Sequence, residues 1–140
     1  MSAVQQPGLR PFIVFDSVPA GCVAYPVNNN RHAPLLWTGE WVIVATEQRH
    51  PIEGELFVIQ WQSGGGPQIV EATTMKNKPY WVVGARHRGA DAQNLGFGKL
   101  GDIIGDGPYR PDQLEQRFLG RVVGILQAAF GELRIVEGVA

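Results

Sequence analysis

The residues that could do chemistry are few and scattered along the chain. The three histidines, His32, His50 and His87, lack the close spacing of zinc ligands, so surface imidazoles are expected rather than a metal centre. Cys22 is the single cysteine and has no histidine beside it in the sequence, which favours a small, partly buried side chain over a nucleophile. The sequence therefore predicts no metal site and no cofactor.

Two stretches have features of phosphate recognition, and both have simpler interpretations. The segment Ser63–Pro67 contains three consecutive glycines, but no Lys-Ser or Lys-Thr follows and no helical pattern begins there, so a hairpin turn is favoured. The basic triplet at 86–88 could contact phosphates, yet Asp91, Asp102 and Asp106 follow it and the formal net charge of the chain is −1. We expect no direct binding of nucleic acid.

The elements that must position these residues are short strands. The runs Trp41–Val44 and Leu56–Ile59 are rich in β-branched and aromatic residues, which suit a buried pleated surface. Between them, Thr46–Glu55 contains Pro51 and Gly54 and is expected to be a wide loop. With 18 glycines, 10 prolines and no repeat, the chain has many turns, so we predict a mainly β, largely antiparallel fold.

The remaining elements are also short. Asp16–Pro26 is turn-like, and one helix is expected where a proline opens the first turn and acidic residues lie near the positive end of the helix dipole. The expected helix is Pro111–Phe118, and the further expected strands are Phe12–Phe15, Gln68–Thr73, Tyr80–Ala85, Leu119–Leu126 and Leu133–Val136.

A long, glycine-rich passage runs from Arg86 to Gly107. Its apolar residues are too frequent for a simple linker, so they either dock on the domain or wait for a partner. One interpretation is a mobile binding loop with Phe97, Ile103 and Ile104 as its anchors. The alternative, which the sequence supports equally, is a hairpin packed permanently on the sheet.

Length and composition bound the class of protein. A chain of 140 residues suits a single domain, expected over residues 12–140 with residues 1–11 as a flexible arm. One cysteine excludes an internal disulfide and indicates a reducing compartment. No apolar run approaches the roughly 18 residues that span a bilayer, and the N-terminus lacks the pattern of a signal peptide. We expect a cytoplasmic protein with no membrane partner.

Several segments, in their order and spacing, resemble one known family. Val18–Gly21 is similar to a cleavage-site turn in which an Ala-Gly bond follows an apolar residue, and Pro51–Ile59 is similar to an element in which a glycine opens a strand. Leu35–Val44 resembles a Gly-Asp strand signature, with glutamate in place of aspartate, and Phe118–Leu126 resembles a closing strand. On these residues the chain from Val18 to Gln127 resembles the C-terminal domain of LexA and phage repressors, which shares its β-fold with signal peptidase.

The resemblance implies a serine nucleophile activated by a neutral lysine, but both positions carry other residues. The serine position falls at Asn30, counting back from Gly39, and the lysine position falls near Glu71. Asn30 cannot supply an alkoxide, and Glu71 has the charge opposite to that of lysine. The cleavage-like Ala20–Gly21 bond lies too close to Asn30 in the sequence to fold back into a groove. The dyad is degenerate, and we expect no enzymatic activity.

Arg31 and Glu71 allow two interpretations of the former catalytic groove. In one, Glu71 pairs with Arg31 across the groove, so that an ion pair replaces the dyad and Arg31 becomes a binding residue. In the other, which is favoured, Glu71 points to solvent from a half-exposed strand.

The leading hypothesis for function is a non-catalytic, LexA-like regulatory module that binds a protein partner and dimerises, of phage or prophage origin. Residues 1–11 leave no room for a helix-turn-helix, so no DNA-binding domain of its own is expected. One alternative is a serine-type hydrolase or self-cleaving peptidase with a displaced nucleophile, for which Ser63 and Lys76 are the available pair. The other is a small structural or virion-associated β-protein.

The end of the chain supplies the expected dimer contact. Leu133–Val136 is a short run in which Leu133 and Ile135 alternate with other residues after the closing strand. An edge strand exposes unpaired backbone groups, and pairing with its own copy would satisfy them. A homodimer is therefore expected through Leu133 and Ile135.

Overall fold

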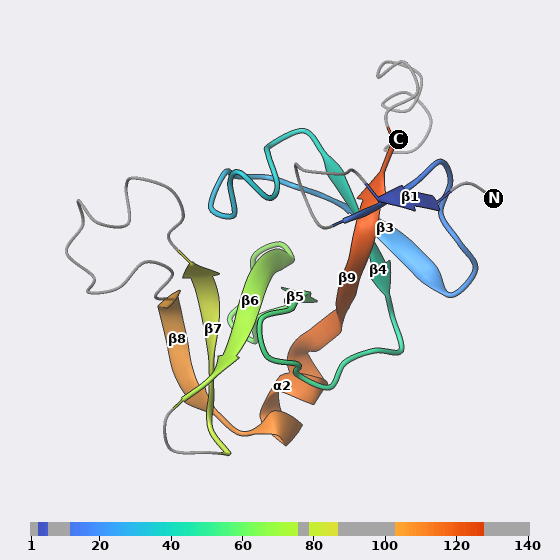
Figure 1. The fold of residues 1–140 in the computed structure, drawn as a ribbon. Coiled ribbons are helices and arrows are strands. Elements are labelled where there is room, and N and C mark those ends of the chain that lie inside the picture. The colour runs from blue at the N-terminus through green and yellow to red at the C-terminus, as the bar shows by residue number, and fades with distance from the viewer. Residues whose placement is uncertain (1–2, 6–11, 76–78, 87–102, 128–140) are drawn as a thin grey trace.

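The computed structural model describes residues 3–5, 12–75, 79–86 and 103–127, which form a mainly β fold with one nine-stranded sheet (Figure 1). The strands are β1 (Ala3–Gln5), β2 (Ile13–Phe15), β3 (Cys22–Pro26), β4 (Trp41–Ala45), β5 (Leu56–Ile59), β6 (Gln68–Thr74), β7 (Trp81–Arg86), β8 (Ile103–Tyr109) and β9 (Phe118–Leu126), and the helix is α2 (Pro111–Arg117). The predicted fold class is confirmed.

The nine-residue strand β9 joins the two halves of the sheet. Along one edge it pairs with β4; along the other it pairs first with β5 and then with β2. The β5 side continues through β6 and β7 to β8, and the β2 side ends at β1, while β3 pairs with β4. All of these pairings are antiparallel except that of β2 with β9. In Figure 1, β9 runs between the group β1 to β4 and the group β5 to β8.

Two glycines allow β9 to pair closely with its neighbouring strands. A Cβ atom at Gly120 would lie 2.4 Å from the carbonyl oxygen of Ala45 in β4, and one at Gly124 would lie 2.5 Å from that of Ile13 in β2. No real Cβ atom tolerates such a contact, so only glycine permits the two backbones to approach this closely.

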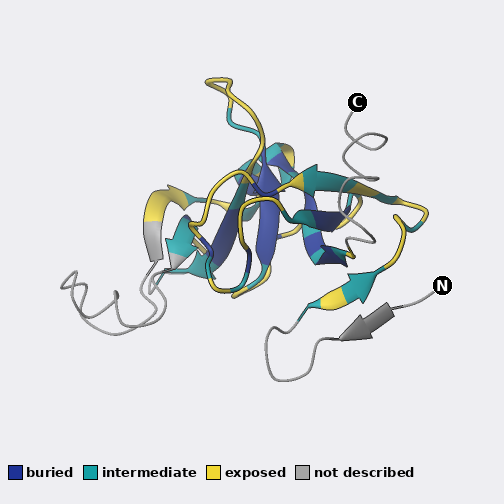
Figure 2. Ribbon diagram, turned by 90° about the horizontal axis from the view of Figure 1, so that it is seen from above, coloured by how far each residue is buried: buried dark blue, intermediate teal, exposed yellow. Residues whose placement is uncertain are grey.

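The side chains of β5 divide the interior into two cores, because successive residues of a strand point to opposite faces. Both faces of β5 are covered, which explains why its sequence is continuously apolar rather than alternating. Figure 2 shows the buried residues gathered in the central strands and the exposed ones in the loops. The first core consists of Val27, Leu36, Val42, Val44, Leu56, Val58, Val122 and Ile125. The second core consists of Phe57, Ile59, Val70, Ala72, Trp81, Val83, Leu114 and Phe118.

The helix α2 closes the second core. Its N-terminus is capped by Gln113, whose side-chain Oε1 accepts a hydrogen bond from the backbone N–H of Arg110 at 2.8 Å, and Pro111 occupies the first turn. Leu114, on the inner face of α2, is fully buried. The predicted helix is confirmed to within one residue at its C-terminus. At seven residues, α2 is too short to cross a membrane, and no other described segment forms a helix that could do so.

Three strands lie where the sequence indicated turns, an arm or a loop. Cys22–Pro26 forms β3, so the turn-like prediction for Asp16–Pro26 is wrong for its second half; β3 is an edge strand in the described sheet, where a proline is tolerated. Ala3–Gln5, expected in a flexible arm, form β1. Ile103–Tyr109, expected in a loop, form β8.

The glycines of β8 explain the last difference. A Cβ atom at Gly105 would lie 2.0 Å from the carbonyl oxygen of Val83, and one at Gly107 would lie 2.7 Å from that of Trp81. These glycines therefore allow close approach to β7 rather than marking a flexible passage. Ile103 and Ile104 pair with Arg86 and Ala85 in the ladder, so this end of the passage belongs to a hairpin, whereas Phe97 lies outside the described residues.

Candidate binding groove

A groove of about 480 Å³ lies between β6, β7 and β8 and the loop that contains Arg31. Its volume is within the range of about 300–1,000 Å³ that is usual for ligand sites. Val70 and Val83, which belong to the second core, form its apolar base, and the small residues Gly84 and Ala85 leave it hollow. The other lining residues are Arg31, Trp61, Gln68, Ile69, Gly105 and Asp106.

The groove opens where β6 and β7 separate. The two strands pair from Thr74↔Trp81 to Glu71↔Gly84 and no further. Beyond that point β6 continues to Gln68 on β5, and β7 continues to Arg86 on β8. The next partners in the register would be Val70 and Ala85, and then Ile69 and Arg86, but neither of these pairs forms.

His32 occupies the point of separation. Its Nε2 atom donates a hydrogen bond to the carbonyl oxygen of Ile69 at 2.8 Å, and the side chain is only 3% exposed. Because hydrogen-bonding directions alternate along an antiparallel strand, this carbonyl is one that would otherwise face β7. The imidazole therefore replaces a ladder bond and anchors the 28–38 loop over the end of β6.

Asparagine side chains give the 28–38 loop its shape. Asn30 Oδ1 accepts hydrogen bonds from the backbone N–H and the hydroxyl of Thr38, at 2.8 and 2.9 Å. Asn29 Oδ1 accepts one from the backbone N–H of Arg31 at 3.1 Å, the local bonding that favours asparagine in turns. The loop backbone beneath Arg31 is thus held on both sides, while its own side chain is exposed.

A network of polar and aromatic side chains builds one wall of the groove. The indole Nε1 of Trp61 donates to Gln68 Oε1 at 3.0 Å, and the Trp61 and Tyr109 rings lie 6.3 Å apart. The Tyr109 hydroxyl donates to Asp106 Oδ2 at 2.6 Å, and the Arg117 guanidinium lies over the Tyr109 ring. Partial burial and then the bond to Asp106 raise the pKa of Tyr109 above its ordinary value of 10.0.

The two charged residues of the groove differ in how fully they are engaged. Asp106 accepts from the Tyr109 hydroxyl through one oxygen and from the backbone N–H of Gly107 through the other, at 3.0 Å. The guanidinium of Arg31 has no hydrogen bond or ion pair with any residue that the structure describes. Among the charged residues that line the groove, Arg31 is therefore the one whose hydrogen-bonding groups are not engaged by a described residue.

Asn30 and Glu71, to which the resemblance assigned the serine and lysine positions, both make contacts within the fold. Asn30 shapes the loop, as described above. Glu71 is only 3% exposed, on the sheet face it shares with its cross-strand partner Leu56, so the favoured interpretation of a solvent-facing carboxylate is wrong. The physical reason is that the 28–38 loop, which lies far earlier in the sequence, covers this face, with Leu36 packed in the same core as Leu56. The Arg31–Glu71 ion pair is not among the ion pairs found between described residues.

The other predicted site residues lie away from the groove or outside the described residues. Ala20 and Gly21 form an exposed turn before β3, where Gly21 has a φ of 81° and the N–H of Cys22 donates to the carbonyl of Pro19 at 3.1 Å. Neither residue lines the groove. Phe97, Leu133 and Ile135 lie outside the described residues, as does Lys76, whereas Ser63 is exposed in a turn.

Sequence reasoning missed most of the groove. His32 was expected to be a surface residue, which is wrong, and Trp61, Gln68 and Asp106 had no assigned role in a site. Trp61 precedes the Ser63–Pro67 turn and Gln68 follows it. An aromatic and a polar residue at the two ends of a predicted hairpin turn were the sequence feature that could have indicated this wall of the groove. Nothing local in the sequence marks His32, since its partner Ile69 is 37 residues away.

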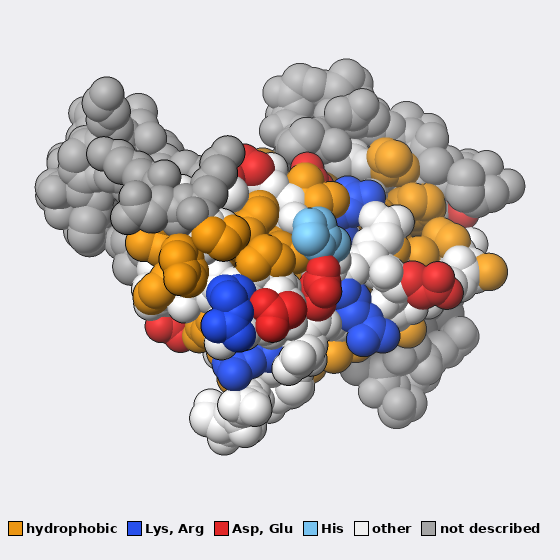
Figure 3. Space-filling model, turned by 90° about the horizontal axis from the view of Figure 1, so that it is seen from below, with side chains coloured by type: hydrophobic (Ala, Val, Ile, Leu, Met, Phe, Trp, Pro, Cys, Tyr) orange, Lys and Arg blue, Asp and Glu red, His pale blue; other side chains and the backbone are white. Residues whose placement is uncertain are grey.

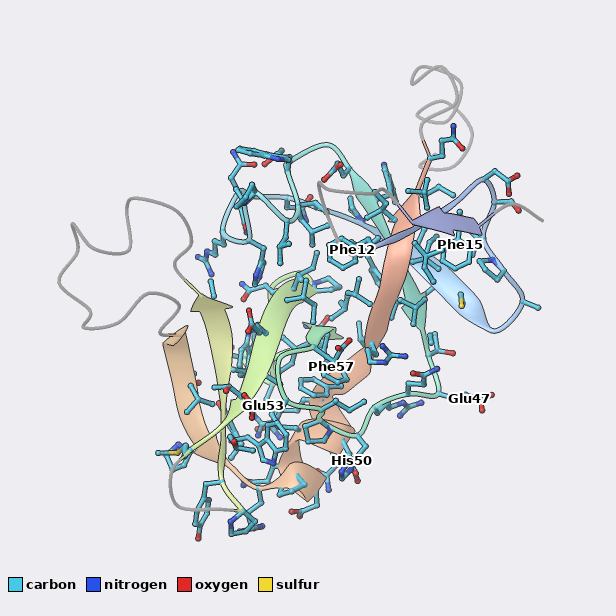
Figure 4. The ribbon with its side chains drawn as sticks, viewed as in Figure 1. Phe12, Phe15, Glu47, His50, Glu53 and Phe57 are labelled. Atoms are coloured by element: carbon cyan, nitrogen blue, oxygen red, sulfur yellow. The ribbon has the colours of Figure 1, made fainter. Side chains whose placement is uncertain are left out.

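Two polar clusters elsewhere fasten the 46–55 loop and do not form a metal site. Glu53 lies beside β6 and His50 beside α2 (Figure 4); Glu53 accepts hydrogen bonds from Thr73 and Thr74, and His50 pairs with Glu115 at 2.5 Å. Within the described part of the chain, no three His, Cys, Asp or Glu residues are placed to hold a metal ion. The face that Figure 3 shows has basic and acidic side chains interspersed rather than a field of one sign.

No protein-family model matches this sequence, and neither a curated protein nor a solved structure does. The groove must therefore be interpreted from its own geometry.

Proposed function

We propose that this protein is a non-catalytic, LexA-like regulatory module that binds an extended segment of a partner protein in the groove between β6 and β7. The observation that carries the proposal is the separation of these two strands. It leaves an apolar base flanked by strand edges, which is the arrangement by which sheets accept an added peptide strand.

The geometry of the groove supports binding more than chemistry. Ile69 presents its backbone to the gap, so its N–H can donate to a bound strand while His32 holds its carbonyl. The partly exposed Ile69 and Ala85 offer apolar contact for side chains of that strand, above the buried Val70 and Val83. The described residues that line the groove include no hydroxyl, thiol or lysine side chain that could act as a nucleophile or as a neutral amine base.

The dyad positions agree with a binding role. Asn30 is occupied in shaping the loop, and Glu71 is buried with a charge opposite to that of lysine. A module of this kind would keep the groove of a self-cleaving domain and lose the reaction. Homodimerisation through Leu133 and Ile135 belongs to the same proposal.

The test is selection of peptides from a randomised octapeptide library displayed on phage. We expect enriched peptides to bind the protein, and Ala85→Trp to abolish binding by filling the hollow of the groove. Ala20→Trp makes the same change at an exposed position outside the groove and serves as the matched control. Failure to enrich any peptide, or binding that survives Ala85→Trp in a folded variant, contradicts the proposal.

A second measurement addresses the absence of catalysis. The protein is incubated at pH ~10, where a lysine near its reference pKa loses its proton, and its mass is followed. We expect one intact species and no covalent labelling by a serine-directed reagent. Fragments that separate at Ala20–Gly21, or stoichiometric labelling, would favour a peptidase with a displaced nucleophile.

A further inference from the structure

We infer that the groove selects an extended peptide segment that carries an acidic side chain, and that Arg31 is the residue that reads it. This inference rests on the proposed function, because it names the class of segment that the same groove accepts. It concerns selectivity among peptides rather than peptide binding itself.

The charges of the groove point to an acidic ligand. Asp106 is held by Tyr109 and by the backbone of Gly107, so its carboxylate is already hydrogen-bonded through both oxygens. Arg31 lines the groove and has no carboxylate partner among the described residues. A guanidinium presents paired donors that match the two oxygens of a carboxylate, so Asp or Glu is the side chain that best completes this site.

The hydrogen bonds that hold the loop backbone around Arg31 favour a role for this residue in binding a ligand. Asn29 bonds the Arg31 backbone, Asn30 bonds Thr38, and His32 is anchored to Ile69. The backbone is thus fixed at the residue itself and at both of its neighbours, whereas the side chain remains exposed. Because the loop is already ordered, it loses little conformational freedom when a peptide binds, and the entropic cost of binding is smaller.

The apolar base sets the context of the acidic residue. Successive side chains of an extended strand point to opposite sides, so a segment whose apolar residues face Val70 and Val83 presents the intervening residues away from the base. Arg31 belongs to the loop that covers the end of β6, not to the base. The preferred segment therefore has Asp or Glu adjacent in sequence to Val, Ile or Leu.

The experiment compares peptides that differ at one position. Octapeptides enriched from the randomised library are synthesised with their termini blocked, each with its acidic residue and with the matching Glu→Gln or Asp→Asn change. Fluorescence anisotropy should show that the amide form binds about five- to tenfold more weakly, and that this difference shrinks as salt is added. Arg31→Gln should remove the difference, and Arg31→Glu should favour a lysine at that position.

The controls separate this inference from the proposed function. Arg49→Glu makes the same charge reversal at an exposed residue that does not line the groove, and it should leave the preference for the acidic peptide unchanged. Peptides that bind with no acidic preference, or a preference that survives Arg31→Glu, overturn the role of Arg31 and leave peptide binding intact. Binding that requires a free C-terminal carboxylate instead of an acidic side chain also overturns it. The absence of any binding peptide contradicts the proposed function itself.

Discussion

The two cores of the sheet are built from different side chains and are covered in different ways. The buried residues of the first core are all aliphatic, with the partly buried Phe12 and Tyr25 packed against them. The second core contains Phe57, Phe118 and Trp81, and the rings of Phe57 and Phe118 stack with centroids 4.2 Å apart. The second core is also the one whose residues Val70 and Val83 form the base of the groove.

The difference indicates why the groove lies where it does. β6 and β7 remain paired at one end, from Thr74↔Trp81 to Glu71↔Gly84, while stacking of Phe57 on Phe118 and the helix α2 stabilise the second core. At the other end the strands can separate, because His32 of the 28–38 loop donates to the Ile69 carbonyl in place of a backbone hydrogen bond from β7. The groove therefore lies between the second core, which contains the aromatic stack, and the 28–38 loop, which packs on the first core.

The largest expected effect comes from truncating the aromatic core. Phe57 and Val58 are adjacent in β5, fully buried, and point into the second and first cores respectively. Phe57→Ala should lower the free energy of unfolding by about 3–5 kcal/mol, whereas Val58→Ala should lower it by about 2 kcal/mol, because it removes fewer buried atoms. Urea denaturation measures both, and equal losses would contradict the importance of the aromatic stack.

The next effect tests whether both halves depend on β9. Gly120→Ala places a methyl group 2.4 Å from the Ala45 carbonyl and should reduce the free energy of unfolding by about 3 kcal/mol. Gly66→Ala is the control, since that position has open space and should change the stability by less than about 0.5 kcal/mol. If thermal unfolding of Gly120→Ala matches that of Gly66→Ala, the close approach of β9 to β4 is not required.

A smaller effect should connect the two regions directly. His32→Ala removes the donor to the Ile69 carbonyl, which should reduce the free energy of unfolding by about 2 kcal/mol and weaken peptide binding. His50→Ala removes an exposed contact with Glu115 and should cost about 1 kcal/mol or less, with no change in peptide affinity. Unchanged peptide binding by folded His32→Ala would show that the loop does not hold the groove open.

The smallest effect concerns the pH dependence of the groove wall. Because the pKa of Tyr109 is raised in the native state, the unfolded state loses this proton first as pH rises. The stabilisation is fully present below pH 10.0 and is lost as the pH rises through the native pKa. Tyr109→Phe should therefore show a shallower decline in its urea midpoint above pH 10.0 than the unmodified protein, and identical declines would refute the assignment.

Local sequence patterns were sufficient for the elements that carry their own signals. The continuous apolar runs of β4 and β5 predicted buried strands, and the proline and acidic residues at Pro111 and Asp112 predicted α2. These features depend on neighbours within a few residues, which the linear sequence displays. β3 was missed and β8 was only one of two interpretations of its segment, because their Pro and Gly residues are typical of turns, and only the sheet shows an edge position or a close contact.

The site itself depended on tertiary structure. Residue types and local patterns were enough to predict a mainly β fold and to show that Asn30 and Glu71 stand where the resemblance requires a serine and a lysine. The tertiary structure was needed to show that Glu71 is buried, that His32 bonds the Ile69 carbonyl at the end of β6, and that Arg31 lines a groove. The physical reason is that the point where two strands stop pairing is set by a side chain 37 residues away, through a contact that no local periodicity encodes.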